Sequence, residues 1–233
     1  GVVVERGAVV RWQDRETGMD LVDAGAEWAL GQCVYETSPP NRELKPEGFR
    51  RAPARNVRLQ PVAAGPIWTS LAFQADLEGC ATNQGLKGEL RLYETEKRVE
   101  WHFSARKLPV TRPESLYVVF PFRWPDAQMV FEAQGGPITP GVSQLPGSSS
   151  DWQTFQGYVA LRSPQGQLVW TSDEAPLIQL GGFNLGKWQR VTQVAKPYVY
   201  SWVMNNYWFT NFRVSQEGEF HWSYHLTTSR QSD

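Results

Sequence analysis

The sequence is poor in the residues on which several common classes of protein depend. It has two cysteines and three histidines among 233 residues, which argues against a disulfide-rich scaffold and leaves few ligands for a transition metal. Cys33 and Cys80 lie far apart and lack the C-x-x-C spacing of a redox or zinc motif. We expect two reduced, buried thiols; a disulfide between them stays open, and so does the cellular compartment.

Long apolar runs and blocks of like charge are also missing. No stretch of about 18 apolar residues is present, so no membrane-spanning helix is expected. The 23 Lys and Arg residues nearly balance the 24 Asp and Glu residues. Without a basic cluster, neither nucleic acid nor an anionic membrane is an expected partner. Residues 1–6 lack an initiator Met and a signal-peptide layout, which indicates a strand already under way in a longer polypeptide.

Helical periodicity is almost absent, and turn residues are frequent. Twenty Gly and sixteen Pro separate short apolar or alternating runs, and 13% of the residues are aromatic. This pattern is typical of many strands joined by turns. Residues 99–105 alternate apolar and polar side chains, which predicts one buried and one exposed face. We therefore predict that residues 1–233 form one large all-β domain, an antiparallel two-sheet sandwich with few or no helices.

Two segments are too rich in proline, glycine and serine to be read as ordinary strands. Residues 38–54 predict an exposed loop without regular structure. Residues 135–150 predict an ordered loop folded over the sheet, with Ile138, Val142 and Leu145 as its apolar anchors.

No group of residues predicts a catalytic site. Hydrolysis of a glycosidic bond normally requires two carboxyl groups at a defined separation. The acids nearest the aromatic-rich segments fit turns and caps better than an acid and nucleophile pair; they are Asp151, Asp173, Glu174, Glu217 and Glu219. No catalytic residue is assigned.

The histidines do not predict a metal site either. His221 and His225 are four residues apart in a run that alternates as a strand. At that spacing they share a face but stand about 13 Å apart, too far to hold one ion. We expect these two and His102 to be solvent-side strand residues, and we expect no metal.

Aromatic rings and side-chain amides gather in residues 198–212, and these are the groups with which proteins hold sugars. Asn205 and Asn206 precede Tyr207 and Trp208, while a second indole and amide pair lies near the long loop. The alternative is structural: buried aromatics, with asparagines that satisfy backbone groups. The candidate carbohydrate contacts are Gln144, Trp152, Gln156, Asn205, Asn206 and Trp208.

Several motifs together resemble one family of enzymes. The chain is similar to the C-terminal β region of glycoside hydrolase family 38, the α-mannosidase family, loosely before residue 115 and more specifically from Tyr117 to Leu226. The motifs that carry this resemblance span residues 17–23, 30–35, 135–141, 144–148, 151–156, 175–179 and 200–211.

The resemblance implies a galactose-mutarotase-like supersandwich placed after a catalytic barrel. In that family the nucleophile and the zinc ligands lie in the N-terminal region, to which no part of this chain corresponds. It therefore implies a non-catalytic C-terminal domain whose partner is the N-terminal catalytic domain of the same polypeptide. Zinc would belong to that domain, and the resemblance allows a mannoside-type carbohydrate as a ligand of this chain.

Two other classes of function stay open. The aromatic and amide side chains also suit a free-standing carbohydrate-binding module or lectin. An epimerase or mutarotase would need a histidine and a carboxylate in one cleft, and histidines carried on strands argue against it.

Three structural expectations follow. The sandwich is essentially free of helices. A large apolar face is exposed where the missing domain docks, because Trp and Phe exceed the needs of one core. Finally, residues 135–150, Trp152, Gln156 and residues 205–208 meet at one edge of the sandwich.

Overall fold

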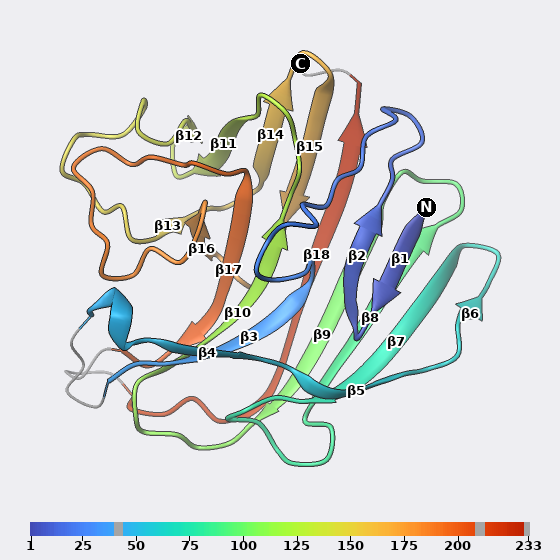
Figure 1. Cartoon of the computed structure of the whole chain (residues 1–233), viewed down its shortest axis with the longest axis horizontal. Helices are drawn as coiled ribbons and strands as arrows, with labels where there is room; N and C mark the ends of the chain where they lie inside the picture. Colours follow the sequence, from blue (N-terminus) through green and yellow to red (C-terminus); the bar gives the residue numbers. More distant parts are fainter. Residues whose placement is uncertain (40–43, 208–212, 231–233) are drawn as a thin grey trace.

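The computed structural model describes residues 1–39, 44–207 and 213–230. Two antiparallel sheets are stacked on each other, and an N-terminal hairpin lies beside them (Figure 1). The hairpin consists of β1 (Val2–Glu5) and β2 (Ala8–Trp12). Within the described residues the only helical element is the 3-10 turn η1 (Pro46–Gly48), which confirms the prediction of an essentially helix-free, all-β chain.

The smaller sheet has six strands, and every neighbouring pair runs antiparallel. Across the sheet, the strands are β13 (Gln153–Thr154), β16 (Leu177–Leu180), β17 (Tyr198–Asn205), β10 (Glu114–Pro121), β3 (Gln32–Thr37) and β4 (Arg50–Pro53).

The larger sheet has ten strands and is also antiparallel throughout. In order, its strands are β12 (Gly136–Ile138), β11 (Gln128–Ala133), β14 (Val159–Ser163), β15 (Gly166–Thr171), β18 (Gly218–Ser229), β9 (Val99–Lys107), β8 (Leu86–Tyr93), β7 (Trp68–Asp76) and β5 (Arg55–Leu59), while β6 (Ala63–Ala64) pairs with β7.

An aromatic core fills the space between the two sheets. The rings of Phe120 and Tyr224 lie 4.8 Å apart, and Trp170 packs 5.4 Å from each of them. Trp101 and Phe103 of β9 are buried on this inner side, as the alternation in residues 99–105 predicted. Full burial of each such side chain stabilises the fold by roughly 1.5–3 kcal/mol.

A second apolar cluster covers the other face of the six-stranded sheet. Tyr117 of β10 stacks on Trp202 of β17 at 5.9 Å and meets Phe183 from a loop at 4.9 Å. The loops around residues 26–28 and 183–185 supply further members of this layer. Both faces of β10 are therefore buried, which explains its continuous apolar sequence. The ten-stranded sheet instead keeps a polar outer face.

The prediction for residues 38–54 was wrong in part, because β4 and η1 lie within them. Strand β4 pairs with β3, and the guanidinium of Arg51 reaches the buried carboxylate of Glu36 at 2.5 Å. The same guanidinium lies 3.9 Å from the centre of the Phe183 ring. The ion pair and this cation–π contact fix a polar, proline-rich segment against the sheet.

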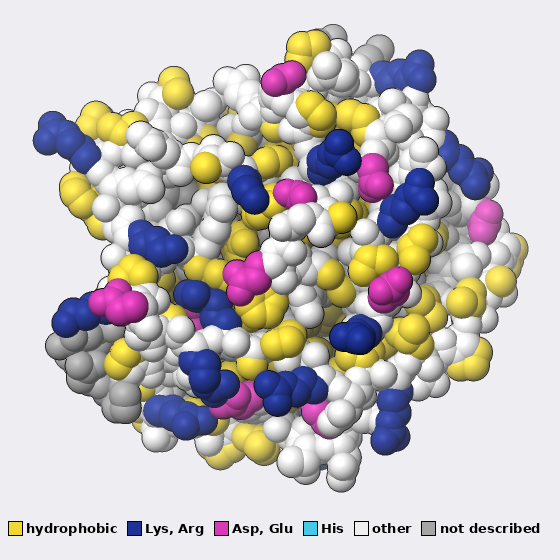
Figure 2. Space-filling view, in the orientation of Figure 1, with side chains coloured by type: hydrophobic (Ala, Val, Ile, Leu, Met, Phe, Trp, Pro, Cys, Tyr) yellow, Lys and Arg dark blue, Asp and Glu magenta, His cyan; other side chains and the backbone are white. Residues whose placement is uncertain are grey.

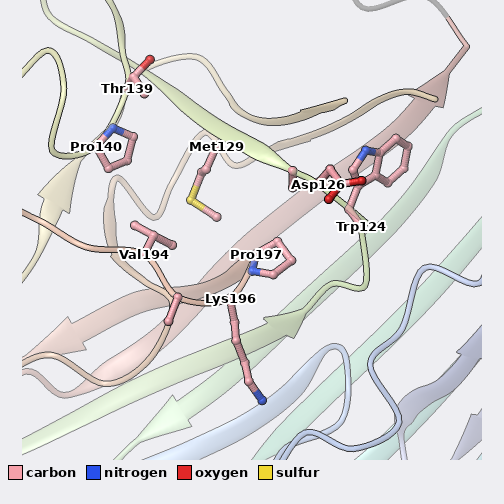
Figure 3. A pocket seen from close by; sticks show the side chains of 10 residues that line it. Trp124, Asp126, Met129, Thr139, Pro140, Val194, Lys196 and Pro197 are labelled. Carbon is pink, nitrogen blue, oxygen red and sulfur yellow. The ribbon is translucent and has the colours of Figure 1, made fainter. Parts of the chain in front are cut away.

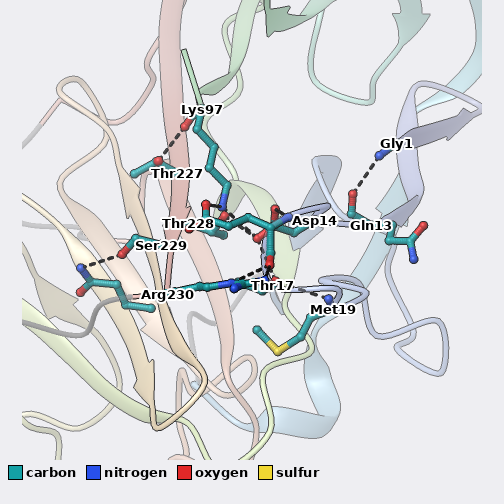
Figure 4. A network of polar contacts seen from close by, with 12 residues as sticks. Gly1, Gln13, Asp14, Thr17, Met19, Lys97, Thr227, Thr228, Ser229 and Arg230 are labelled. Carbon is teal, nitrogen blue, oxygen red and sulfur yellow. Dashed lines mark hydrogen bonds and ion pairs between the residues drawn. The ribbon is translucent and has the colours of Figure 1, made fainter. Parts of the chain in front are cut away.

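A polar network fastens the turn after β2 to the ten-stranded sheet (Figure 4). The carboxylate of Asp14 accepts hydrogen bonds from Thr17 and Thr228, each at 2.8 Å, and from Lys97 at 3.1 Å. Gly18 in this turn has a φ of +74°, a left-handed conformation that glycine adopts without steric strain.

The two thiols agree with the reduced alternative. Cys33 and Cys80 are free and buried, and burial raises the pKa of Cys80 to about 11. In the described residues no helix is long and apolar enough to cross a membrane.

Candidate functional site

Two loops are joined at one corner of the molecule, on the left in Figure 1. The backbone N–H of Gly147 donates to the carbonyl of Arg190 at 2.7 Å. The N–H of Gln189 donates to the hydroxyl of Ser150 at 2.7 Å, and that of Gly186 to the carboxylate of Asp151 at 3.0 Å. The loop of residues 135–150 is thus hydrogen-bonded to residues 186–190. The composition of the loop did not predict this contact.

A cavity of about 390 Å³ opens beside this corner (Figure 3). Its size falls within the range of roughly 300–1,000 Å³ that is usual for small-molecule sites. Figure 3 shows Met129, Val194 and Pro197 around its centre, while Lys196 extends away and donates to the hydroxyl of Tyr198 at 3.2 Å. The lining residues are Trp124, Asp126, Ala127, Met129, Thr139, Pro140, Val194, Ala195, Lys196 and Pro197.

Sequence reasoning missed this cavity. It combines an apolar wall with the exposed carboxylate of Asp126 and the hydroxyl of Thr139. Apolar surface beside a few polar groups is the usual lining of a small-molecule site. The walls come from three segments far apart in the chain, and none of the six candidate contact residues lines it.

Three of the six candidates lie near the corner loops. The amide of Gln144 donates to the side chain of Gln153 at 2.9 Å and accepts from the backbone of Gly141 at 3.2 Å. Trp152 is half-buried and packs 5.8 Å from Trp202. The side chain of Gln156 is exposed, and its backbone N–H donates to the carbonyl of Glu132 at 2.9 Å.

The structure corrects the predicted role of Asn206. The side chain is buried and its amide is used by the backbone: it accepts from the N–H of Glu114 at 2.7 Å and donates to the carbonyl oxygens of Val110, Arg112 and Val214 at 3.0–3.1 Å. It has the structural role that was the alternative, and we no longer include it among the sugar contacts.

The other two candidates are Asn205, the last residue of β17, and Trp208. Asn205 is half-buried, and its side-chain oxygen accepts from the backbone of Tyr207 at 3.5 Å. Trp208 lies outside the described residues.

Contacts extend from the long loop to β17, but the expected convergence, which includes Trp208 outside the described residues, stays a prediction. Gln144 contacts Gln153, the neighbour of Trp152, and the ring of Trp152 packs on Trp202. Trp202 in turn lies 6.1 Å from Tyr207. The rings of Trp152 and Trp202 thus link the segment beside the loop to β17, and Trp202 contacts the ring of Tyr207 after the strand. A sugar-contact role for Gln144, Trp152, Gln156, Asn205 and Trp208 stays a prediction.

A second group of polar side chains occupies the outer face of the ten-stranded sheet. Glu100 of β9 lies between two imidazoles: Nε2 of His102 is 2.9 Å from Oε2, and Nδ1 of His225 is 3.0 Å from Oε1. Tyr93 also donates to this carboxylate at 2.8 Å, and Arg98 forms an ion pair with it at 3.1 Å. The histidines are carried on strands, as predicted, but two of them share one carboxylate.

The ionisation of Glu100 reflects these partners. Burial alone raises its pKa, but the contacts from His102 and Tyr93 and the charges of His225 and Arg98 outweigh that effect. The net result is a lowered pKa and a carboxylate that stays ionised. Figure 2 views the opposite side of the molecule, where Lys, Arg and apolar side chains are interspersed and no histidine is visible. In the parts of the chain that are described, no three His, Cys, Asp or Glu side chains are grouped to hold a metal ion.

Comparison with known proteins finds solved structures with a similar fold. No protein-family profile and no curated protein sequence matches the chain. Among solved structures, an α-mannosidase from Enterococcus faecalis V583 matches 99% of the chain with a TM-score of 0.70 and 10% identity. An Enterococcus faecalis protein of glycosyl hydrolase family 38 matches 99% with a TM-score of 0.66 and 10% identity.

The chain spans only 28% and 29% of those two proteins. A protein from Synechocystis sp. PCC 6803 matches 97% of the chain and 89% of its own length, with a TM-score of 0.53 and 11% identity. At these identities the likeness shows the fold alone. It agrees with the predicted fold class, an all-β chain of antiparallel sheets, and the fold is similar to that of a part of the α-mannosidase structures.

Proposed function

We propose that this chain is an accessory β domain of an α-mannosidase-like glycoside hydrolase, packed against a catalytic domain and lining part of its sugar pocket. The motifs of the sequence support this, and so does a fold match that covers nearly the whole chain but less than a third of each α-mannosidase. The aspartate nucleophile and the zinc would then belong to the catalytic domain, because no residue of this chain matches their motifs.

The observation that carries the proposal is an exposed apolar surface on well-held loops. Val142 is 79% exposed, Leu145 82%, Trp188 59% and Val191 43%, and the four residues lie on two loops that are joined by backbone hydrogen bonds. We call these four residues the apolar corner. Apolar side chains that cluster on a surface usually mark a contact with another protein surface. Residues 181–197 add three cations and no acid to this region, so the partner surface is expected to carry carboxylates at its rim.

The first test is hydrolysis. The isolated chain should not hydrolyse aryl α-mannosides with or without added zinc, whereas the polypeptide as its gene encodes it should do so with zinc. Strong turnover by the isolated chain would contradict the accessory role. A gene that begins at Gly1, with no upstream barrel carrying paired His and Asp residues, would contradict it equally.

The second test addresses the corner in the longer polypeptide. Replacing Leu145 and Trp188 with Ser should lower its mannosidase activity and loosen the attachment of the β domain, which limited proteolysis detects. A matched change of the exposed Leu59→Ser, on β5 at the far end of the larger sheet, should alter neither. Equal effects of the two variants would mean that the corner is not the docking surface.

A free-standing carbohydrate-binding module is the second candidate, and the cavity beside the corner favours it. Such a module should bind free mannosides in the isolated chain. Asp126→Asn and Thr139→Val should weaken that binding, because both groups border the cavity. Calorimetry that detects no binding of mannose or short mannosides would rule this candidate out.

A further inference from the structure

A polar cavity of about 650 Å³ lies where β5 meets the turn between β7 and β8. Its volume is in the range of small-molecule sites. No residue of the apolar corner lines it, and neither does any of the six candidate sugar contacts. Three separate segments supply the lining, and five of its six side chains are polar. The lining residues are Asn56, Val57, Arg58, Asp76, Asn83 and Gln84.

The carboxylate of Asp76 is held at this cavity by donors from two other segments. The side-chain amide of Asn56 donates to Oδ2 at 2.8 Å, and the backbone N–H of Gln84 donates to Oδ1 at 2.8 Å. The hydrogen bond from Asn56 and then that from Gln84 lower the pKa of Asp76, and the charge of Arg58 acts in the same direction. The carboxylate is therefore ionised, and each oxygen keeps a lone pair for a further donor.

Three residues around the cavity have a left-handed backbone although none of them is glycine. The φ angle is +51° at Asn56, +60° at Asn83 and +72° at Gln84, and among the described residues only two other non-glycine residues have a positive φ. The register of β5 against β7 also shifts between Arg55 and Arg58. Backbone of this kind clusters at ligand sites, and a bulge redirects side chains. The turn and the irregular strand thus place amide groups around one carboxylate.

Other polar groups of the lining are open to a ligand. Within the described residues, the side chains of Arg58, Asn83 and Gln84 form no hydrogen bond with another residue. The guanidinium can only donate, whereas each amide can donate and accept. Val57 is the one apolar side chain of the lining.

These groups restrict the class of ligand. The ionised carboxylate of Asp76 disfavours an anion, and the guanidinium of Arg58 disfavours a cation. A lining with one apolar side chain disfavours a ligand with a large apolar face. A neutral ligand with hydroxyls on neighbouring carbons fits, because carboxylate and amide groups can each contact two hydroxyls at once.

We propose that this cavity binds neutral compounds with neighbouring hydroxyl groups, carried either by a sugar ring or by an open-chain polyol. Binding is weak, because the lining offers no aromatic ring for a ligand to pack on. The inference does not rest on the accessory role: the site lies within this chain and needs no second domain.

The test is nuclear magnetic resonance of the isolated chain, which follows backbone and side-chain N–H signals. The probes are methyl α-mannoside for the sugar ring, mannitol for the open-chain polyol, and calcium chloride for a cation. At least one of the two hydroxyl compounds should shift the signals of Asn56, Asn83 and Gln84 in a saturable manner. The response to each compound identifies the source of the hydroxyls, and calcium chloride should leave these signals in place.

Two variants test the lining directly. Asn83→Gly removes an amide and keeps the left-handed backbone, which glycine adopts without strain. Arg58→Gln removes the guanidinium. Each should raise the dissociation constant about 3–10-fold, the effect of one or two hydrogen bonds. Arg6→Gly is the matched control: Arg6 has a φ of +50° in the turn between β1 and β2 and does not line the cavity. It should leave the dissociation constant unchanged.

Three outcomes would overturn the proposal. In the first, neither hydroxyl compound shifts the signals of Asn56, Asn83 and Gln84, whether or not signals elsewhere respond. In the second, calcium chloride shifts them and neither hydroxyl compound does. In the third, Asn83→Gly and Arg58→Gln, both with the melting temperature of the unsubstituted chain, bind as tightly as that chain.

Discussion

Asn206 joins chain segments that meet at the end of β17. Its side-chain amide accepts from the backbone N–H of Glu114, the first residue of β10, and donates to three carbonyl oxygens from two loops. Removing it leaves several buried backbone groups without a partner, and each such group costs about 1–3 kcal/mol. Asn206 therefore stabilises the packing of these segments, and its loss should be costly.

We expect Asn206→Ala to lower the free energy of unfolding by about 2–4 kcal/mol, as measured by urea denaturation. Asn205→Ala is the control, because the neighbouring side chain makes one long contact at 3.5 Å; it should cost less than about 1 kcal/mol. Similar losses for the two variants would contradict the structural role of Asn206.

Lys107 and Glu114 form an ion pair within the protein interior. The ammonium nitrogen lies 2.6 Å from the carboxylate, and the two side chains are 1% and 4% exposed. Tyr35 donates its hydroxyl to the same carboxylate, and burial followed by this contact raises the pKa of Tyr35. A buried charge whose partner is removed is strongly destabilising.

Lys107→Met should therefore cost about 3–5 kcal/mol in unfolding free energy. The matched exposed pair is Arg50 and Glu78, 2.7 Å apart with side chains 57% and 35% exposed. Arg50→Met should cost no more than about 1 kcal/mol. Thermal and urea unfolding of both variants measures the difference, and equal costs would show that burial does not set the strength of the Lys107 pair.

Two features at the scale of residues could not be predicted from the sequence. The aromatic and amide composition of residues 198–212 predicted that this region matters, but composition does not tell whether an amide faces solvent or backbone. The Glu100 cluster was out of reach for another reason. Glu100 and His225 are directly paired across β9 and β18, and their proximity depends on a strand register between segments 125 residues apart.

At the scale of elements, most strands could be predicted because their side chains alternate or are uniformly apolar. The exceptions have a physical cause. Strand β11 follows a turn at Asp126, whose φ is +53°, and β4 lies in a proline-rich segment. β4 is polar, and its place in the sheet depends on the pairing of Arg51 with Glu36, a tertiary contact that local propensity does not contain.

The network around Asp14 makes a prediction about acid stability. Burial raises the pKa of Asp14, but hydrogen bonds from Thr17, Thr228, the backbone of Glu16 and Lys97 outweigh it, so the pKa is lowered. A carboxyl group with a lowered folded-state pKa adds stability above its unfolded value of about 3.9. That contribution is lost as the pH falls through the folded-state pKa.

Asp14→Asn should therefore destabilise the chain clearly at pH 6 and much less near pH 3. Urea unfolding at both pH values measures this, and the exposed Asp173→Asn serves as the control, with little effect at either pH. A destabilisation by Asp14→Asn that is the same at pH 6 and pH 3 would mean that the charge of Asp14 does not contribute to the network.

At the scale of the whole molecule, the two sheets differ in how their faces are covered. The six-stranded sheet is covered on both faces, by the main core and by the second cluster of loops. The ten-stranded sheet packs on one face only and presents a polar outer face with the Glu100 cluster. The apolar corner lies apart from both, on loops that are tied to each other by backbone hydrogen bonds. The proposed docking surface is thus separate from the polar outer face of the larger sheet.

Because the apolar corner is exposed in the isolated chain, that chain should self-associate weakly at high concentration. Replacing Leu145 and Trp188 with Ser should suppress the association in sedimentation velocity experiments. The melting temperature should stay nearly unchanged, because both side chains already face solvent. Leu59→Ser at the far end of the larger sheet should leave the association intact. If the double variant unfolds at a much lower temperature, the corner is part of the core; if association persists in it, the contact lies elsewhere on the surface.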